Sequence, residues 1–181
     1  LGSNPSAPAK IMYFFKILKK TFFPFYKKKV IKDLFNILND NKRVTNAMFV
    51  GGCVRKFLSN EEIDDIDIAT ILTPEEIIKK FERKDNFEIK NTGISHGTLT
   101  LVSGGESFEI TTLREDVSTD GRHAQVSFTK DWIKDSRRRD FTVNAIYMSA
   151  NGKIFDPQNG TQDLKNKNIK FIGDPDERIK E

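Results

Sequence analysis

A pair of aspartates, Asp65 and Asp67, is the pattern in this sequence that most clearly indicates chemistry. Residues two apart on a strand project from the same face, so the two carboxylates lie side by side while Ile66 and Ile68 face the core. Adjacent carboxylates repel each other unless a cation lies between them, and Mg²⁺ prefers such hard oxygen ligands. Two Mg²⁺ ions can activate an attacking hydroxyl and neutralise a leaving pyrophosphate. The pair therefore favours nucleotidyl transfer, with an exposed acidic strand edge as the alternative.

Two glycines and a third carboxylate extend this pattern. The Gly51-Gly52 pair lets the backbone approach a phosphate, and Arg55 can supply a matching positive charge. Taken alone, the glycines indicate no more than a tight turn. Glu109 stands between apolar neighbours on an expected strand, so its side chain faces away from the core. Glu109 either joins the aspartates or is simply exposed to solvent, and its residue type leaves both alternatives open.

An arginine triplet, 137–139, directly precedes a segment, 140–145, that we expect to begin a buried helix. The planar guanidinium group binds phosphate oxygens through two parallel hydrogen bonds, which suits a triphosphate. The alternative for such a triplet is ordinary surface charge.

The elements that must position these residues predict an α+β domain, in which a small mixed sheet is flanked by helices. Apolar runs predict strands over residues 47–50, 66–70, 87–91, 97–102, 107–113, 153–155 and 168–172. Helical spacing predicts helices over residues 30–39, 73–83, 129–136 and 140–149. The second of these helices begins with a capping box, in which Thr73 is the N-cap and Glu76 its partner. Residues 115–127 are polar and predict an irregular loop.

Composition excludes several classes of protein. The chain has 181 residues and one cysteine, so an internal disulfide framework and a cysteine-based zinc site are excluded, and a cytoplasmic location is expected. No run of 18 apolar residues is present, so we expect no membrane association. The first 42 residues hold nine lysines and two aspartates, which suits either a polyanion such as nucleic acid or a solvated lysine-rich face.

Four short sequence motifs occur in a fixed order along the chain. They are Gly51-Gly52-Cys53-Val54-Arg55, Asp65-Ile66-Asp67-Ile68-Ala69-Thr70, Arg138-Arg139-Asp140-Phe141-Thr142-Val143-Asn144-Ala145 and Phe155-Asp156-Pro157-Gln158-Asn159-Gly160. This series resembles the head and early neck of class II tRNA nucleotidyltransferases, the CCA-adding enzymes, over about residues 45–181. Bacterial poly(A) polymerases share the motifs. The resemblance implies the nucleotidyltransferase fold of DNA polymerase β.

The resemblance also implies a role for each matching residue. Asp65 and Asp67 would be the catalytic magnesium ligands, with Glu109 as the third acidic residue. The implied nucleotide-binding residues, which would hold CTP or ATP, are Gly51, Gly52, Arg55, Arg139, Asp140 and Asn144. The residues that match the family's flexible loop are Asp120, Gly121, Arg122 and His123. The implied reaction is template-independent transfer of CMP and AMP to the 3′ end of tRNA.

Several alternatives stay open at this point. A poly(A) polymerase and a CC-only or A-only enzyme share the motifs, whereas a non-catalytic RNA-binding module has no need of the paired aspartates. The segment 92–100 matches the CCA-adding pattern rather than the arginine-rich segment of the polymerases. Lys56 departs from the family, which has an aspartate there. The oligomeric state has no signal in the sequence.

The same resemblance predicts how the chain is divided into domains. We expect a cleavage scar over residues 1–10, a basic and aromatic helical segment over 11–44, the catalytic head over 45–174 and the start of a helical neck over 175–181. The family's next motif, which reads the base, is expected at about the last of these segments and is absent from the chain.

Overall fold

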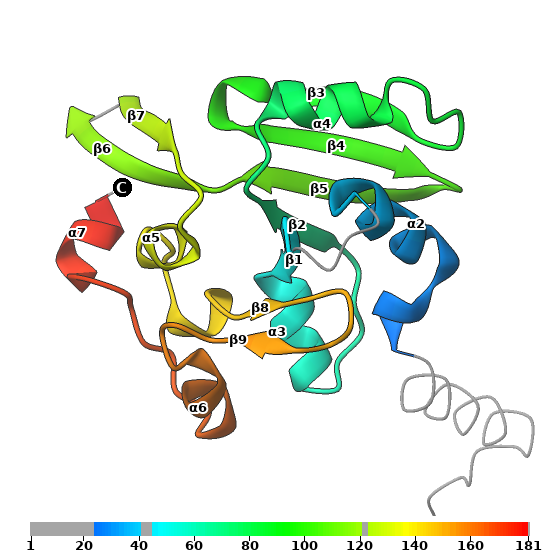
Figure 1. Ribbon diagram of the computed structural model, residues 1–181. Coiled ribbons are helices and arrows are strands. Elements are labelled where there is room, and N and C mark those ends of the chain that lie inside the picture. The colour runs from blue at the N-terminus through cyan, green and yellow to red at the C-terminus, as the bar shows by residue number, and fades with distance from the viewer. Residues whose placement is uncertain (1–23, 41–44, 121–122, 181) are drawn as a thin grey trace, which may run out of the picture.

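The computed structural model describes residues 24–40, 45–120 and 123–180, and within them a mixed sheet of seven strands forms the centre of the molecule (Figure 1). Across the sheet the strands follow the order β3-β4-β5-β2-β1-β8-β9. Their bounds are β1 Ala47–Val50, β2 Ile66–Thr70, β3 Glu88–Gly93, β4 Thr98–Ser103, β5 Glu106–Thr112, β8 Tyr147–Met148 and β9 Ile154–Phe155. Strands β2 and β5 are parallel, and every other neighbouring pair is antiparallel. The predicted α+β class is confirmed.

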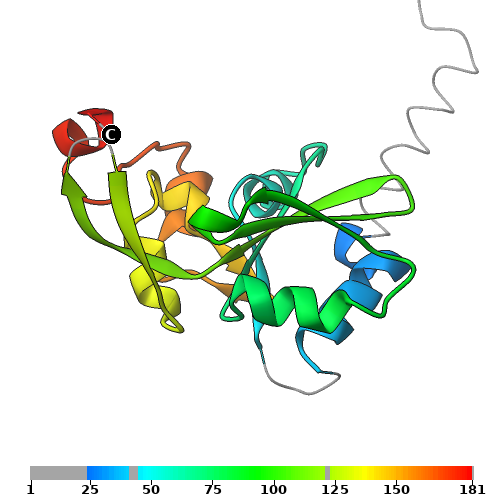
Figure 2. The ribbon, with the colours of Figure 1, turned by 90° about the horizontal axis from the view of Figure 1, so that it is seen from above.

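Helices cover one face of this sheet and border the other. They are α2 Lys29–Leu38, α3 Gly52–Leu58, α4 Pro74–Phe81, α5 Trp132–Arg137, α6 Gly160–Lys165 and α7 Pro175–Lys180, with 3₁₀ turns η1 Phe25–Lys27, η2 Ile94–His96 and η3 Thr142–Asn144. Helices α2 and α4 lie side by side, as the view from above shows (Figure 2). Buried side chains of α2, α3 and α4 form the main core with the sheet. Among the described residues, no helix has both the length and the apolar character needed to cross a membrane.

The alternation of side chains along the strands gives the sheet a second face, which carries polar side chains beside a smaller buried apolar cluster of Met48, Val50, Ala69, Leu113 and Tyr147. Ile66 and Ile68 of β2 are buried in the main core, as are Phe108 and Ile110 of β5. The residues between them, Asp67 and Glu109, therefore project from the opposite face.

Part of the basic and aromatic segment belongs to this core. Ile31, Leu34, Phe35 and Leu38 of α2 are at most 2% exposed and lie in the same cluster as the sheet residues. The described part of the segment before residue 45 therefore packs as an integral helix of the head.

Sequence patterns that depend only on neighbouring residues predicted a helix start and two strands correctly. The capping box of α4 is present: the Glu76 amide donates to Thr73 Oγ1 at 3.3 Å, and the Thr73 amide donates to Glu76 Oε2 at 2.8 Å. The turn at 103–106 joins β4 and β5, which match the strands predicted over 97–102 and 107–113, with Ser103 paired to Glu106.

Three predictions are wrong. Residues 115–127 do not form an irregular loop, because strands β6 Arg114–Asp120 and β7 His123–Phe128 pair as a separate antiparallel hairpin (Figure 1). This polar segment lacks the apolar alternation that marks a strand, so its pairing has no signal in the sequence.

The helix expected over residues 140–149 is instead the short turn η3 followed by β8, which pairs with β1. A short, fully buried strand has the same apolar run as a buried helix, which explains the error. The strand expected over 168–172 is reduced to one bridge between Phe141 and Phe171. Helices α3 and α6 were not predicted; each begins with glycine, a poor helix former.

Candidate active site

Strand pairing brings the three predicted carboxylates together. Asp67 of β2 lies directly opposite Glu109 of β5 in the parallel register, and neighbouring strands are about 4.8 Å apart. Asp65 immediately precedes β2, two residues from Asp67. Asp67 is half-buried, while Asp65 and Glu109 are exposed. The arrangement places the three carboxylates near one another on the second face of the sheet, with Asp65 and Glu109 exposed to solvent.

The charges of these groups act on one another. Burial raises the pKa of Asp67, the charges of Glu109 and Asp65 raise it further, and the charge of Arg139 opposes them. Oxygen donors crowded in this way suit a hard divalent cation. Among the described residues, no three or more acidic, histidine or cysteine side chains are grouped closely enough to hold a metal ion. A set of fewer than three protein ligands fits Mg²⁺, which usually keeps several water ligands and binds substrate phosphates.

The glycine pair shapes the space beside Asp67. Gly51 has φ +74° and precedes α3, and a Cβ at this position would lie 3.6 Å from Asp67 Oδ2. A Cβ at Gly52 would meet no atom within 4 Å, so the start of α3 is open to a ligand. The Cys53 Sγ donates to the backbone oxygen of Val50 at 3.2 Å, and burial raises the pKa of this thiol to about 11. Cys53 is therefore a packing residue and not a nucleophile.

Arg55 connects the first and third sequence motifs. Its Nη1 donates to Oδ1 of Asn144, and Nδ2 of Asn144 donates to Oδ1 of Asp140 at 3.2 Å. Lys56, the departure from the family, forms an ion pair of 2.7 Å with Asp64, the residue before Asp65. Side chains of the α3 helix thus contact Asn144 in the third motif and Asp64 just before the second.

Arg139 is held by two groups that the sequence analysis missed. Its Nη2 donates to Oδ2 of Asp135 at 3.1 Å, and its Nε donates to the Tyr147 hydroxyl at 3.2 Å. Burial alone would raise the pKa of Asp135, but the charges of Arg139 and Arg138 outweigh it and hold that pKa below its ordinary value. The spacing of Asp135 and Arg139, four residues apart on one helical turn, is a signal that could have indicated their contact. Tyr147 has no such signal, since only the pairing of β8 brings it here.

The predicted flexible loop is described only in part. Asp120 ends β6 and His123 begins β7, and their backbones pair, whereas Gly121 and Arg122 lie outside the described residues. The backbone of the loop's flanks is therefore part of the hairpin, and its role at the site stays a prediction.

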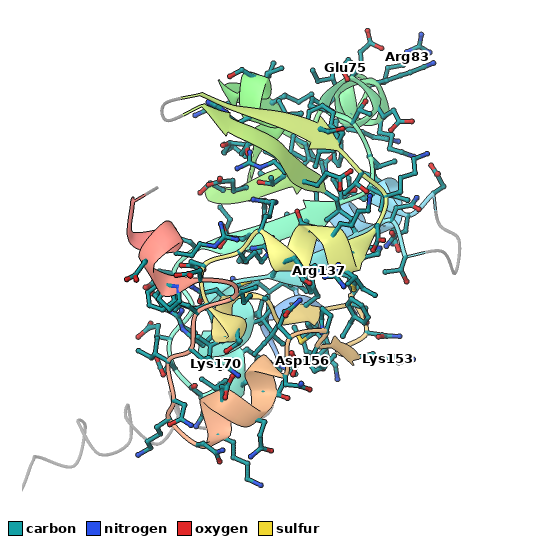
Figure 3. The ribbon with its side chains drawn as sticks, turned by 90° about the vertical axis from the view of Figure 1, so that its left-hand side faces the viewer. Glu75, Arg83, Arg137, Lys153, Asp156 and Lys170 are labelled. Atoms are coloured by element: carbon teal, nitrogen blue, oxygen red, sulfur yellow. The ribbon has the colours of Figure 1, made fainter. Side chains whose placement is uncertain are left out.

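Beyond the arginines, a carboxylate fixes the start of α6. Asp156 accepts hydrogen bonds from the amides of Gly160 at 2.8 Å and Thr161 at 2.9 Å. Figure 3 shows Asp156 near the start of α6 and Arg137 on α5. Thr142 Oγ1 of η3 donates to Asp163 of α6 at 2.7 Å, so α6 supports the turn that carries Asn144.

A mixed sheet with paired aspartates beside a glycine turn, and with arginines opposite, defines a head domain of the nucleotidyltransferase type. The family described as "Poly A polymerase head domain" matches residues 47–170, and the chain belongs to this family. The predicted resemblance is thereby confirmed.

Known relatives agree with this assignment. The chain is 44% identical over 153 residues to CCA tRNA nucleotidyltransferase 1, mitochondrial, of Homo sapiens, covering 84% of this chain and 34% of that protein. It resembles the crystal structure of the Bacillus stearothermophilus CCA-adding enzyme in complex with CTP, with a TM-score of 0.69 and 33% identity over 84% of this chain and 36% of that one. It also resembles a tRNA nucleotidyltransferase complexed with a primer tRNA and an incoming ATP analog, with a TM-score of 0.56 and 29% identity over 70% and 35% of the two chains. The chain thus spans about a third of the length of these relatives.

Proposed function

We propose that this chain is the catalytic head of an enzyme that transfers CMP and AMP from CTP and ATP to the 3′ end of tRNA. The observation that carries the proposal is the register that places Asp67 beside Glu109, two residues after Asp65. The relatives support the substrate class, because one of them is named for CCA addition to tRNA and another is complexed with CTP.

Asp65 and Asp67 would hold two Mg²⁺ ions, and Glu109 completes the acidic site. When bound, Mg²⁺ supplies positive charge that stabilises the attacking and leaving oxygens of an in-line displacement. In the reaction, the terminal ribose oxygen forms a bond to the α-phosphorus, the bond between that phosphorus and the bridging oxygen breaks, and pyrophosphate leaves. The three carboxylates orient the reacting groups at one edge of the sheet and need little rearrangement, because the strands already hold them there.

The triphosphate would lie between α3 and the arginines. Gly51 and Gly52 leave the start of α3 free of side chains, so a phosphate can approach the backbone there. Arg139 provides positive charge within electrostatic reach of Asp67. Arg55 provides a second guanidinium, oriented by Asn144.

Asp140 acts through the same hydrogen-bonded series. It receives a hydrogen bond from Asn144, whose Oδ1 in turn accepts one from Arg55. Asp140 and Asn144 would therefore fix the Arg55 side chain against the nucleotide. The predicted cytoplasmic compartment stays a prediction, since the human relative is named mitochondrial.

A poly(A) polymerase is the second candidate, because the family is named for poly(A) polymerase heads. A CC-only or A-only enzyme would use the same site. A non-catalytic RNA-binding module is disfavoured because it has no use for Asp67 paired with Glu109 in register, next to Asp65.

The test is nucleotide incorporation by a full-length protein that carries this head. With Mg²⁺ and a tRNA that ends before CCA, we expect labelled CTP and then ATP to be added at the 3′ end, and the Asp65→Ala, Asp67→Ala double variant to add neither. Long adenylate tails on any RNA would favour the polymerase instead. Equal incorporation by the double variant would exclude the proposed assignment of these residues.

A further inference from the structure

We propose that Asp135 and Tyr147 are positioning residues, which hold the guanidinium of Arg139 in place for a nucleoside triphosphate. The inference rests on the proposed function, because it assigns to Arg139 the phosphates of that substrate. Neither residue belongs to the carboxylate cluster or to the glycine turn.

The carboxylate of Asp135 divides its two oxygens between two arginines. Oδ1 accepts from Nη2 of Arg138 at 2.8 Å, and Oδ2 accepts from Nη2 of Arg139 at 3.1 Å. The same Oδ2 accepts the hydroxyl proton of Tyr147 at 2.7 Å. The Asp135 side chain is fully buried, and the side chains of Arg138 and Arg139 are 15% and 16% exposed. One anion thus neutralises one of two guanidinium charges and leaves a net positive charge at this end of α5.

Tyr147 acts on the same guanidinium from the sheet. The Tyr147 hydroxyl accepts a hydrogen bond from Nε of Arg139 and donates one to Oδ2 of Asp135. Because Arg139 also donates to Asp135, the three side chains form a closed triangle of hydrogen bonds. The Tyr147 ring is fixed by edge contacts with Trp132 at 5.5 Å and by a tilted contact with Phe155 at 6.0 Å between ring centroids. The hydroxyl therefore has little freedom, and neither has the arginine it binds.

The sheet register directs this triangle toward the active site. Tyr147 of β8 pairs with Val50 of β1, and the pairing of Phe49 with Ile68 places Val50 beside Asp67 on β2. Tyr147 and Asp67 consequently project from the same face, two strands or about 10 Å apart. Arg139, a member of the triangle, also acts electrostatically on Asp67, because its positive charge lowers the energy of the ionised Asp67 carboxylate.

A fixed guanidinium has a direct consequence for affinity. Binding a phosphate with a mobile arginine costs side-chain entropy, and the triangle removes that cost before the ligand arrives. Phosphates are common to all nucleoside triphosphates, so the contribution of Asp135 and Tyr147 is the same for CTP and ATP.

The experiment compares two tyrosines of this chain. Tyr147→Phe removes the hydroxyl and keeps the ring, and Tyr26→Phe is the matched control, since Tyr26 also packs among aromatic rings but lies on η1. Binding of CTP and of ATP with Mg²⁺ is measured by calorimetry for both variants and for Arg139→Ala. We expect Tyr147→Phe to raise the Kd of both nucleotides about threefold to tenfold, the effect of one lost hydrogen bond, and Tyr26→Phe to leave both unchanged.

A double variant separates positioning from general packing. If Tyr147 acts through Arg139, then Tyr147→Phe has no further effect on Kd in the Arg139→Ala background. Additive losses would overturn the inference, as would an unchanged Kd in Tyr147→Phe. The ¹⁵N resonance of the Arg139 Nε gives a second readout: it should shift in Tyr147→Phe and in Asp135→Asn, but not in Tyr26→Phe.

The two proposals fail in different ways. One outcome is that the wild type binds no nucleotide, while the Arg139 Nε resonance still differs between the wild type and Tyr147→Phe. That outcome would contradict the proposed function, and with it the role of Arg139 in binding the triphosphate. Measurable nucleotide binding whose Kd is the same in the wild type and in Tyr147→Phe would contradict the positioning role alone.

Discussion

Asp67 is the residue at which function and stability conflict most directly. It is half-buried, it lies beside Glu109 in the register, and it follows Asp65 by two residues. Burial and the two negative neighbours disfavour its ionised form, while only the charge of Arg139 among the named influences favours it. An active site often keeps such crowded charges because a bound ligand reduces their mutual repulsion, whereas without a ligand the repulsion only lowers the stability of the fold.

We therefore expect Asp67→Asn to stabilise the chain in the absence of divalent ions. The pKa of Asp67 is raised in the folded state, so its contribution to stability is lost as the pH rises above its ordinary value of 3.8. The gain in Tm from Asp67→Asn should be largest at pH 7 and should narrow as the pH falls toward 4. Thermal unfolding from pH 4 to 8 checks this, and a gain that does not depend on pH would contradict it. Addition of Mg²⁺ should raise the Tm of the wild type more than that of the variant.

Alanine substitutions at Gly51 and Gly52 should affect different properties: stability at Gly51 and nucleotide binding at Gly52. Gly51 has φ +74°, which is strained for an L side chain, so Gly51→Ala should lower the free energy of unfolding by about 1 to 3 kcal/mol. Gly52→Ala meets open space and should leave stability intact, yet its methyl group would occupy the proposed phosphate site and weaken CTP binding. Urea unfolding and CTP titration of both variants check the pair. Equal loss of stability in the two would contradict this division of roles.

At this scale the sequence predicted what depends on local geometry. The alternation of strand side chains was enough to predict that Asp65 and Asp67 lie side by side, and it correctly predicted that Glu109 faces away from the core. It could not show that β2 and β5 are neighbours, so the contact of Asp67 with Glu109 stayed open. Tyr147 was missed because its role depends on a contact between β8 and α5 that leaves no trace in residue spacing.

At the scale of elements, short segments support one another by close approach. A Cβ at Gly160 would lie 2.0 Å from the backbone oxygen of Thr142, so α6 packs directly on the backbone of η3. The Thr142 hydroxyl donates to Asp163 across this contact. Through η3, the contact determines where Asn144 meets Arg55.

Gly160→Ala should therefore separate α6 from η3. The backbone oxygen cannot yield as a flexible side chain would, so we expect a loss of about 2 kcal/mol or more in the free energy of unfolding. The displaced Asn144 should also weaken nucleotide binding. Gly93→Ala is the control, because its Cβ would meet Thr98 at an ordinary 3.5 Å. If the two variants unfold at the same urea concentration, close packing at Gly160 is not important to the fold.

Elements were predictable where their signals are local. The capping box of α4 lies within four residues and was found, whereas β8 and the β6–β7 hairpin depend on partners elsewhere in the chain. The start of α6 is fixed by Asp156, four residues before Gly160 and outside the usual N-cap position, so the capping rules did not identify it.

At the scale of the whole molecule, α2 belongs to the head although the family match begins at residue 47. Its apolar face completes the core beneath the sheet, on the side opposite the carboxylates. The site therefore depends on a helix that supplies none of its residues.

Leu34→Ala tests that dependence. Leu34 is fully buried, so the substitution leaves a cavity and should lower the free energy of unfolding by about 2 to 5 kcal/mol. Asn36→Ala, at an exposed position of the same helix, should have little effect. Denaturant unfolding of both variants checks the prediction. A small loss in Leu34→Ala would indicate that α2 is peripheral to the head.

The last prediction concerns nucleotide choice by the chain of 181 residues. The groups proposed to bind the nucleotide, which include Gly52, Arg55 and Arg139, are suited to phosphates, and phosphates are shared by every nucleoside triphosphate. Discrimination between bases needs hydrogen-bonding groups on their Watson–Crick edges, and none of these proposed phosphate ligands is assigned that role. We therefore expect CTP, ATP, UTP and GTP with Mg²⁺ to bind weakly and with similar Kd, and the Asp65→Ala, Asp67→Ala double variant to bind all four more weakly still. Calorimetric titration of each nucleotide checks this. A tenfold preference for CTP and ATP over UTP and GTP would show that base selection resides within these residues.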